Sequence, residues 1–324
     1  MNASRIALVF PGQGSQAVGM GRLLSDAEPQ ARSVFERADR ALGFALSRTC
    51  FEGPEETLRL TAVTQPAILA TSVACLEALA ARAPAGWRGR IACAAGHSLG
   101  EYSALVAAGA LDLEDAVRIV RRRGEYMQEA VPVGEGAMAA VLGMPLDEVR
   151  ALCHDAAEGD VLAPANLNAQ DQTVVAGTAR AVNRLVVLAK QRGARKTVLL
   201  PVSAPFHCDL MAPARERLAR DLSGLRLHDA RFPVIVNVTA RPETGAEVLR
   251  RSLLDQVTSP VRWVESVLRM KELRVDALVE VGPGRVLSGL AKRIVPDIPL
   301  FNIEDPASLR RAGEAIGPPP GVAA

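Results

Sequence analysis

A serine between two glycines is the first residue whose surroundings could do chemistry. Residues 96–100 read Gly-His-Ser-Leu-Gly, the G-x-S-x-G pattern of a serine held on a sharp turn between a strand and a helix. The glycines allow the strained turn, and the following helix directs N–H groups and its positive dipole end at developing negative charge. We therefore predict that Ser98 is a nucleophile that carries an acyl group as an ester. The structural alternative is a tight connection with a capping serine, since short motifs also occur by chance.

A serine hydroxyl needs a base that accepts its proton, and the chain offers four histidines. His207 follows residues 201–206, a loop with two prolines in which a rigid turn can hold an imidazole at a site. We predict His207 as the base. Its structural alternative is a capping histidine for the helix that begins after it. The other three are expected to be surface or packing residues: His97, which should point away from Ser98, His154 and His228.

The elements that must hold these side chains are predicted from apolar runs and turn residues. Ser98 needs a strand before it and a helix after it, and the sequence has an apolar run at 91–95 and small helix-forming residues at 99–108. Asp112 is a suitable N-cap for a further helix through about residue 129. The other expected elements of this part are buried strands at 5–10, 234–237 and 277–281 and an amphipathic helix at 64–83.

The middle third of the chain has a different order of elements. Its patterns predict strand, helix, strand, strand, helix, strand, the split βαβ order of a ferredoxin-like unit, at 137–142, 146–157, 161–167, 173–177, 179–191 and 196–200. The predicted fold class is therefore α/β, with a larger α/β-hydrolase-like domain built on a parallel sheet core at 1–130 and 204–316. An inserted smaller ferredoxin-like (βαββαβ) domain is expected at 131–203. The Gly- and Pro-rich residues 317–324 are expected to form a disordered tail.

Composition narrows the class of protein. The 324 residues include 38 Lys and Arg against 36 Asp and Glu, a net charge of +2 that is too balanced to indicate binding to nucleic acid or to a membrane. Five cysteines without a C-x-x-C pair are typical of free thiols in a reducing compartment. We find no apolar run near the roughly 20 residues that span a bilayer, and no signal peptide. The sequence thus predicts a soluble cytoplasmic protein, with a monomer as the default state.

Several further segments, spread along nearly the whole chain, resemble those of one known family. They are Pro-Gly-Gln-Gly-Ser-Gln at 11–16, Gly-Glu-Tyr-Ser-Ala-Leu at 100–105, Arg-Gly at 123–124, Asn-Leu-Asn at 166–168, Phe-His at 206–207, Gln256, and Glu-Val-Gly-Pro-Gly at 280–284. With the serine motif, they make the chain similar to the malonyl-CoA:acyl carrier protein transacylases and the acyltransferase domains of polyketide synthases. The resemblance implies transfer of malonyl from malonyl-CoA to the phosphopantetheine thiol of a holo-acyl carrier protein, for fatty-acid or polyketide synthesis. It implies no metal and no cofactor, because the coenzyme A thioester is a substrate.

The resemblance also implies catalytic roles. Ser98 is the nucleophile, His207 is its general acid and base, and the backbone N–H groups of Gln13 and Leu99 form the oxyanion hole. Gln256 stands where the family orients the histidine, so a neutral group replaces the acid of a hydrolase triad.

Substrate-binding roles follow from the same resemblance. Malonyl carries a free carboxylate, which a guanidinium can pair with through two parallel hydrogen bonds, and this role falls to Arg123. Without the resemblance, the arginines at 121–123 would be read as a solvated basic face, and the two exposed ones are expected to attract coenzyme phosphates or an acidic carrier protein. Phe206, beside the histidine, favours malonyl over methylmalonyl. Asn166 and Asn168 are expected to bind substrate.

Three alternatives compete with this reading. Gly-x-Gly-x-x-Ala at 12–17 follows a strand as in dinucleotide-binding proteins, but residues 31–41 are helical and charged where an acid-ended strand should follow. A serine esterase or thioesterase with the same Ser98–His207 pair is the closer alternative. Those enzymes place their histidine near the C-terminus, whereas His207 is followed by a long segment. A non-catalytic scaffold would require the serine, histidine and arginine to be placed by accident.

Overall fold

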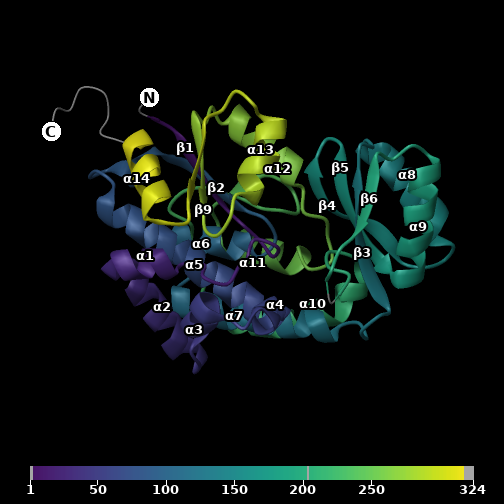
Figure 1. The fold of residues 1–324 in the computed structure, drawn as a ribbon, viewed down its shortest axis with the longest axis horizontal. Helices are drawn as coiled ribbons and strands as arrows, with labels where there is room; N and C mark the ends of the chain where they lie inside the picture. Colours follow the sequence, from purple (N-terminus) through teal and green to yellow (C-terminus); the bar gives the residue numbers. More distant parts are fainter. Residues whose placement is uncertain (1–2, 203, 317–324) are drawn as a thin grey trace.

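The computed structural model describes residues 3–202 and 204–316, which form two β-sheets with helices packed around them (Figure 1). The larger sheet has the strand order β10-β9-β1-β2-β7-β8, and the smaller sheet has the order β4-β5-β3-β6. The chain is therefore a mixed α/β protein, as the sequence predicts. The tail expected at 317–324 lies outside the described residues.

The larger sheet is parallel through its centre. Its strands are β1 (Ile6–Phe10), β2 (Ile91–Gly96), β7 (Val234–Ile235), β8 (Pro242–Glu243), β9 (Ala277–Val281) and β10 (Leu300–Ile303), and β8 pairs with β7 in the antiparallel sense. Every side chain of β1 is buried, with Ile6, Leu8 and Phe10 in one core cluster and Ala7 and Val9 in another. Alternate residues of a strand point to opposite faces, so β1 is covered on both sides. Its uninterrupted apolar sequence follows from this burial.

Helices pack against both faces of the larger sheet. The helices of this part are α1 (Arg22–Ala27), α2 (Pro29–Leu42), α3 (Leu46–Glu52), α4 (Glu55–Arg59), α5 (Thr61–Arg82), α6 (Gly100–Ala107), α7 (Leu113–Glu129), α10 (Ala212–Gly224), α11 (Ala246–Asp255), α12 (Trp263–Glu272), α13 (Val286–Ile294) and α14 (Pro306–Ala315), with 3-10 turns at Trp87–Arg90 and Asp209–Met211. Helices α2, α5 and α7 contribute to the cluster that holds Phe10. Helices α12 and α13 contribute Trp263 and Leu287 to the cluster on the opposite face.

Helix α5 corrects one expectation from the sequence. Among the described residues, Thr61–Arg82 is the helix long and apolar enough to cross a membrane, whereas no such run was expected. However, 83% of its most apolar window is buried inside the protein. The helix is apolar all round because it packs against neighbours on every side, including α2 and α7. It is the central helix of the larger core.

The smaller sheet is entirely antiparallel and belongs to the middle of the chain. Its elements are β3 (Gly136–Leu142), α8 (Leu146–Ala157), β4 (Leu162–Ala169), β5 (Gln172–Thr178), α9 (Ala179–Gln191) and β6 (Lys196–Leu199). Ala139 and Val141 face α8 and α9 in a separate small core, while Met138 and Ala140 join the larger cluster. The second face of this sheet therefore looks toward the rest of the protein.

A short junction ties strand β4 of the smaller sheet to the segment before α12 in the larger part of the protein. The amide of Leu167 donates to the carbonyl of Val261 at 2.9 Å, and the amide of Val261 donates to Ala165 at 2.9 Å. The strand expected at 234–237 is shorter than predicted, because β7 ends at Ile235 and the chain turns away. Asn237 is thereby released from the sheet and lies fully buried next to the serine turn.

Candidate active site

Ser98 lies in the turn between β2 and α6, where the chain reverses sharply. Its φ is +51°, in the left-handed region that serine rarely adopts. A Cβ on Gly96 would lie 1.8 Å from the backbone carbon of Gly100, and a Cβ on Gly100 would lie 2.1 Å from the carbonyl oxygen of Phe10. No larger residue fits at either position without moving the backbone. The close packing of β1, β2 and α6 therefore requires both glycines of the motif.

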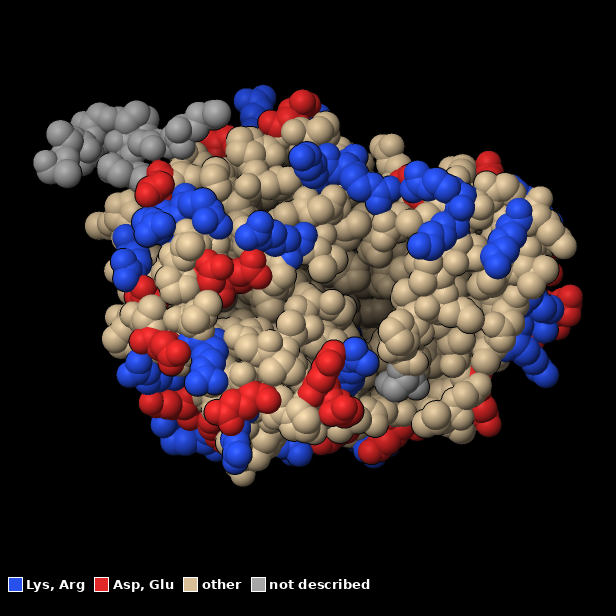
Figure 2. Space-filling model, in the orientation of Figure 1, with Lys and Arg blue, Asp and Glu red and all other residues tan. Residues whose placement is uncertain are grey.

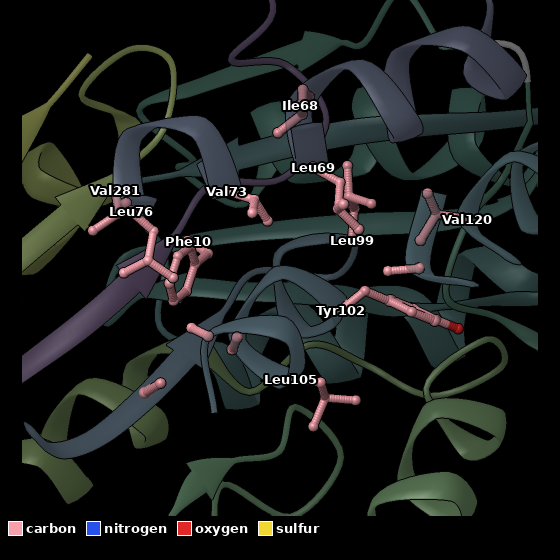
Figure 3. Packing of buried hydrophobic residues seen from close by; sticks show 14 of the residues in the cluster. Phe10, Ile68, Leu69, Val73, Leu76, Leu99, Tyr102, Leu105, Val120 and Val281 are labelled. Atoms are coloured by element: carbon pink, nitrogen blue, oxygen red, sulfur yellow. The ribbon is translucent and has the colours of Figure 1, made fainter. Parts of the chain in front are cut away.

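The helix that follows the serine is anchored in the core. Leu99, Tyr102 and Leu105 are buried and pack in the cluster that includes Phe10 and Leu69 (Figure 3). These large side chains hold α6 in place from its first turn onward. The amides of Gly100 and Glu101 are used within this turn, donating to the carbonyls of His97 and Ser98, so the amide of Leu99 is the donor that the helix start offers beside Ser98.

Ser98, His207 and Gln256 form a hydrogen-bonded chain. Ser98 Oγ lies 2.7 Å from Nε2 of His207, and Nδ1 of His207 lies 2.8 Å from the backbone carbonyl oxygen of Gln256. A carbonyl oxygen can only accept, so Nδ1 carries the hydrogen and Nε2 is free to accept the serine proton. The imidazole thus has the tautomer that a general base requires. It is the backbone of Gln256, and not its side chain, that faces the ring.

The surroundings of His207 keep its ring neutral. Burial, followed by the positive charge of Arg123, lowers the pKa of His207 to about 3, while the Gln256 carbonyl opposes this shift. A neutral imidazole is the form that can take a proton from Ser98. We therefore expect kcat/KM for acyl transfer to stay on its plateau as the pH falls below 6.5, the ordinary histidine value. Single-turnover acylation rates measured from pH 8 downward check this.

Two controls accompany that pH profile. The unfolded chain takes up a proton on His207 near pH 6.5, whereas the native chain does so only near its lowered pKa. The free energy of unfolding therefore decreases as the pH is lowered from the first value to the second. Circular dichroism at each pH separates unfolding from loss of rate. Burial also raises the pKa of Glu101 to about 7, so the profile is repeated with Glu101→Gln. An acid limb near pH 6.5 that persists in this variant would contradict the prediction.

Arg123 lies on α7, and its buried side chain reaches Ser98. Its Nη2 donates to Ser98 Oγ at 3.1 Å and to Gln256 Oε1 at 2.8 Å, and its Nη1 donates to Gln65 Oε1 at 2.8 Å. The side chain is only 2% exposed, and burial lowers its pKa. In the described part of the chain, no carboxylate lies within salt-bridge distance of it. A buried cation held by neutral acceptors suits a guanidinium that pairs with the carboxylate of a substrate.

The two neighbouring arginines differ from Arg123. Arg121 pairs with Glu125 on its own helix at 3.1 Å, and Arg122 pairs with Asp221 at 2.9 Å. Arg122 is exposed, as the sequence predicts, whereas Arg121 is half-buried and its guanidinium lies 4.6 Å from the ring centroid of Phe44. Their partial neutralisation by these acids weakens the idea that they attract anions.

A cavity of about 100 Å³ opens in front of Ser98. It is lined by Gln13, Gln65, His97, Ser98, Leu99, Arg123, Met127, Met138, Asn166, Leu200, Val202, Phe206 and His207. A larger groove of about 500 Å³ adjoins it and shares Gln13, Leu200 and Val202. The space-filling view shows the molecule hollowed between the part that carries the larger sheet and the part that carries the smaller one (Figure 2). The predicted catalytic residues therefore lie at the base of a cleft between two parts of the chain.

The backbone amides near the serine differ in their availability. The amide of Ser98 donates to Asn237 Oδ1 at 2.7 Å and is already used. Within residues 3–202 and 204–316, the amides of Gln13 and Leu99 have no acceptor, and both residues line the cavity. Free donors next to a nucleophile are what an oxyanion requires.

The remaining predicted residues divide between the cavity and the groove. Phe206 and Asn166 line the cavity, whereas Asn168 lines the outer groove. Oδ1 of Asn168 lies 2.8 Å from Nε2 of His97, and the His97 ring packs near Trp263 with a centroid distance of 5.8 Å. The expectation that His97 lies away from the site is wrong, because the residue lines the cavity and its ring contacts Asn168 of the adjoining groove. The serine turn packs closely on the 11–16 loop, since a Cβ on Gly12 would lie 2.4 Å from the carbonyl oxygen of His97.

Sequence reasoning missed three buried polar residues at the site. Gln65 accepts from Arg123, while Glu101 and Asn237 bond to each other and to Gln256. Asn237 follows a strand of a parallel sheet, and sites commonly form where such strands end, so its position was a usable signal. Gln65 had no such signal, since it lies within the apolar pattern of α5.

Within the described residues, no group of three His, Cys, Asp or Glu side chains could hold a metal ion. The site is thus described by its serine, histidine, arginine and amides.

Comparison with known proteins gives consistent matches. The model of a family described as the acyl transferase domain matches residues 7–297. A protein of Bacillus subtilis (strain 168), named malonyl CoA-acyl carrier protein transacylase, is 45% identical over 314 residues, covering 97% of this chain and 98% of that protein. A protein of the same name from Escherichia coli (strain K12) is 43% identical over 314 residues, covering 96% and 99%.

Solved structures match equally well. The malonyl CoA-acyl carrier protein transacylase of Coxiella burnetii superposes with a TM-score of 0.94 at 41% identity, covering 98% of this chain and 99% of that one. A second structure is described as a type II PKS acyl-carrier protein in complex with its malonyl-transacylase. It matches with a TM-score of 0.91 at 43% identity, covering 96% and 99%.

Proposed function

Since this chain belongs to the acyl transferase domain family, we propose that it carries its acyl group as a malonyl ester on Ser98. The chain is an acyltransferase that moves malonyl from coenzyme A to an acyl carrier protein. One observation supports the proposed route most directly: Ser98 Oγ lies 2.7 Å from Nε2 of His207 and 3.1 Å from Nη2 of Arg123. A nucleophile, its base and a cation for the malonyl carboxylate meet at one oxygen.

The first half of the reaction forms the ester. His207 Nε2 takes the proton of Ser98, and the serine oxygen attacks the thioester carbonyl of malonyl-CoA. The resulting oxyanion accepts from the amides of Gln13 and Leu99. When the carbon–sulfur bond breaks, protonated His207 returns its proton to the coenzyme thiolate. The backbone carbonyl of Gln256 holds the ring in one tautomer and stabilises the positive charge that it carries between these steps.

The second half transfers the group. The phosphopantetheine thiol of the carrier protein gives its proton to His207 and attacks the ester carbonyl. The same amides receive the second oxyanion, the bond to Ser98 breaks, and the serine oxygen takes back the proton. The narrow cavity supports transfer over hydrolysis, since a small space filled by the acyl group limits access of water to the ester.

Arg123 is proposed to bind the malonyl carboxylate, so Arg123→Ala should remove the preference for malonyl. We expect kcat/KM with malonyl-CoA to fall roughly a hundredfold or more, because a buried charge-assisted pair is lost. The rate with acetyl-CoA, which has no carboxylate, should change much less. Competition between the two thioesters, read as the ratio of protein adducts, measures this. Arg122→Ala, which removes an exposed neighbour on the same helix, should keep the native ratio, and an unchanged ratio in Arg123→Ala would refute the assignment.

The other substrate contacts are proposed from their positions. Phe206 lines the cavity and limits the room beside the malonyl methylene, which favours malonyl over the branched methylmalonyl group. Asn166 is placed to contact the acyl group in the cavity. Asn168 is placed in the groove through which the longer arm of the thioester would reach Ser98.

Intact mass spectrometry tests the proposed route. Brief mixing with malonyl-CoA should give a protein that is heavier by one malonyl group, and addition of a holo-acyl carrier protein should move that group to the carrier. Loss of the adduct to water before the carrier is added, with no malonyl on the carrier afterwards, would instead indicate the esterase or thioesterase alternative. Absence of any adduct would remove the serine ester.

We further propose finer assignments that the sequence predicts. The larger part, 1–130 with 204–316, is assigned to the α/β-hydrolase-like class by its parallel sheet and serine turn. Residues 131–203 are assigned to the ferredoxin-like class by the βαββαβ order. The protein is proposed to act as a monomer in the cytoplasm, where its five free cysteines would stay reduced, and to need no metal or cofactor.

A further inference from the structure

Glu101 is a buried carboxylate that the proposed mechanism does not use. It lies on the first turn of α6, three residues after Ser98, and is 1% exposed. One of its oxygens, Oε2, accepts from the backbone amide of Asn237 at 2.9 Å and from Nε2 of Gln256 at 2.8 Å. A charge is rarely buried unless something requires it, because removal from water is costly.

Gln256 is the residue that connects this carboxylate to the reacting groups. Its side-chain amide has two ends with opposite requirements: Oε1 accepts from Arg123 at 2.8 Å, and Nε2 donates to Glu101 and, at 3.1 Å, to the carbonyl of Ser98. Its backbone carbonyl faces His207. A reversed amide would present N–H groups to Arg123 and an oxygen to Glu101, so both contacts would become repulsive.

Arg123 depends on this orientation. The guanidinium is held by Gln65 on one side and by Oε1 of Gln256 on the other, with Nη2 also reaching Ser98. Loss of the Gln256 contact would leave Nη2 with the serine oxygen as its remaining acceptor. A displaced guanidinium would then bind a carboxylate in poorer geometry.

We propose that Glu101 is a positioning residue for malonyl transfer: through the oxygen that accepts from Gln256 Nε2, it fixes the Gln256 amide so that Oε1 holds Arg123 at the site of the malonyl carboxylate. The inference rests on the proposed function of Ser98 and Arg123. Burial raises the pKa of Glu101, while the Asn237 amide, the Gln256 amide and the charge of Arg123 oppose the shift, so the donors around the group are arranged for its ionised form.

A simpler role must be separated from this one. An acidic residue in the first turn of a helix is favourable because of the helix dipole, wherever its side chain points. That role requires the charge but not the reach of the side chain. The positioning role requires an acceptor oxygen at the correct distance but tolerates loss of the charge. The two roles therefore make opposite predictions for Asp and for Gln at this position.

The experiment compares Glu101→Asp with Glu101→Gln. Glu101→Asp keeps the charge but withdraws the oxygen, and should lower kcat/KM with malonyl-CoA roughly ten- to a hundredfold, with a clearly smaller loss for acetyl-CoA. Glu101→Gln keeps an acceptor at the same reach and should stay within about threefold of the native rate. Glu125→Gln, an exposed acid on α7, is the matched control and should match the native protein.

A double-variant cycle identifies the intermediary. In a Gln256→Ala background, Glu101→Asp should cause less than about a twofold further loss, since the group that it positions is gone.

Three results would overturn the inference. They are native selectivity in Glu101→Asp, equal losses on both thioesters in Glu101→Asp and Glu101→Gln alike, or losses that multiply in the double variant. Formation of the malonyl adduct by the native protein is measured in the same series. If the adduct forms, the proposed function stands even where the results for Glu101 overturn the inference. Without that adduct, both the function and the inference fall.

Discussion

The Ser98→Ala protein is expected to form no covalent adduct with malonyl-CoA and to lose at least about a thousandfold of its transfer activity. The hydroxyl is the atom to which His207 and Arg123 both point, at 2.7 and 3.1 Å, and the alanine variant has no oxygen with which to form the ester. The residual transfer activity of this variant should come from binding the two substrates near each other. Intact mass spectrometry of the protein and single-turnover transfer to the carrier measure the two effects.

Ser103→Ala is the matched control for this experiment. Ser103 lies on α6, the helix that follows Ser98, and is fully buried, and its hydroxyl has no hydrogen-bond partner in the described part of the chain. Its removal should leave the adduct in place. A malonyl adduct on the Ser98→Ala protein would show that another residue is the nucleophile, and peptide mapping would identify it.

His207→Ala is expected to lower the rate of acylation by about 10²–10⁴-fold, the usual range for loss of a general base. Nε2 of His207 is the acceptor next to Ser98 Oγ, and its neutral form is favoured by burial. Affinity for malonyl-CoA should change far less than the rate, because Arg123 and the amides remain. Rapid-mixing measurements over a range of malonyl-CoA concentrations separate the two quantities.

His228 provides the comparison, since it is exposed and is not among the residues that line the cavity. His228→Ala should acylate at the native rate. If His207→Ala did the same with an intact fold, then the serine would be activated by another group, and His97, which also lines the cavity, would be the next to replace.

Local patterns predicted the order of elements because each pattern reflects local burial. Helices α8 and α9 and strand β9 have the bounds expected from periodicity alone. The same patterns placed Ser98 correctly, since the tight turn needs glycines that are adjacent in sequence. The strand at 234–237 was overestimated because Val236 and Asn237 are buried without pairing in the sheet.

The choice among the three arginines shows what periodicity could have added. Ala116, Val120, Arg123 and Met127 are all buried on α7 and recur at helical spacing, so Arg123 lies in phase with the apolar stripe. Arg121 and Arg122 lie out of phase and reach solvent. The stripe therefore distinguishes the buried arginine without reference to any relative.

The network around Gln256 could not be predicted in this way. Glu101 and Gln256 are far apart in sequence and meet only because α6 and the end of α11 are brought together by the fold. Likewise, the backbone of Gln256 orients His207, and no pattern of side chains reveals which carbonyl will face a ring. The place of His97 at the cavity was missed for the same reason, since the cavity is formed by residues that are far apart in sequence.

The order of strands in the larger sheet also bears on how the protein is made. β1 is synthesised before the other strands of the larger sheet, yet in the finished sheet it lies between β2 and β9, and β9 comes late in the order of these strands. The pairing of β1 with β2 can form early, and with it the turn that carries Ser98. The edge of β1 that will receive β9 must stay open until β9 has been synthesised, and such distant pairings form slowly. A nascent chain released before residue 277 would therefore carry an exposed apolar strand edge, which makes late synthesis the period in which this protein most needs protection from aggregation.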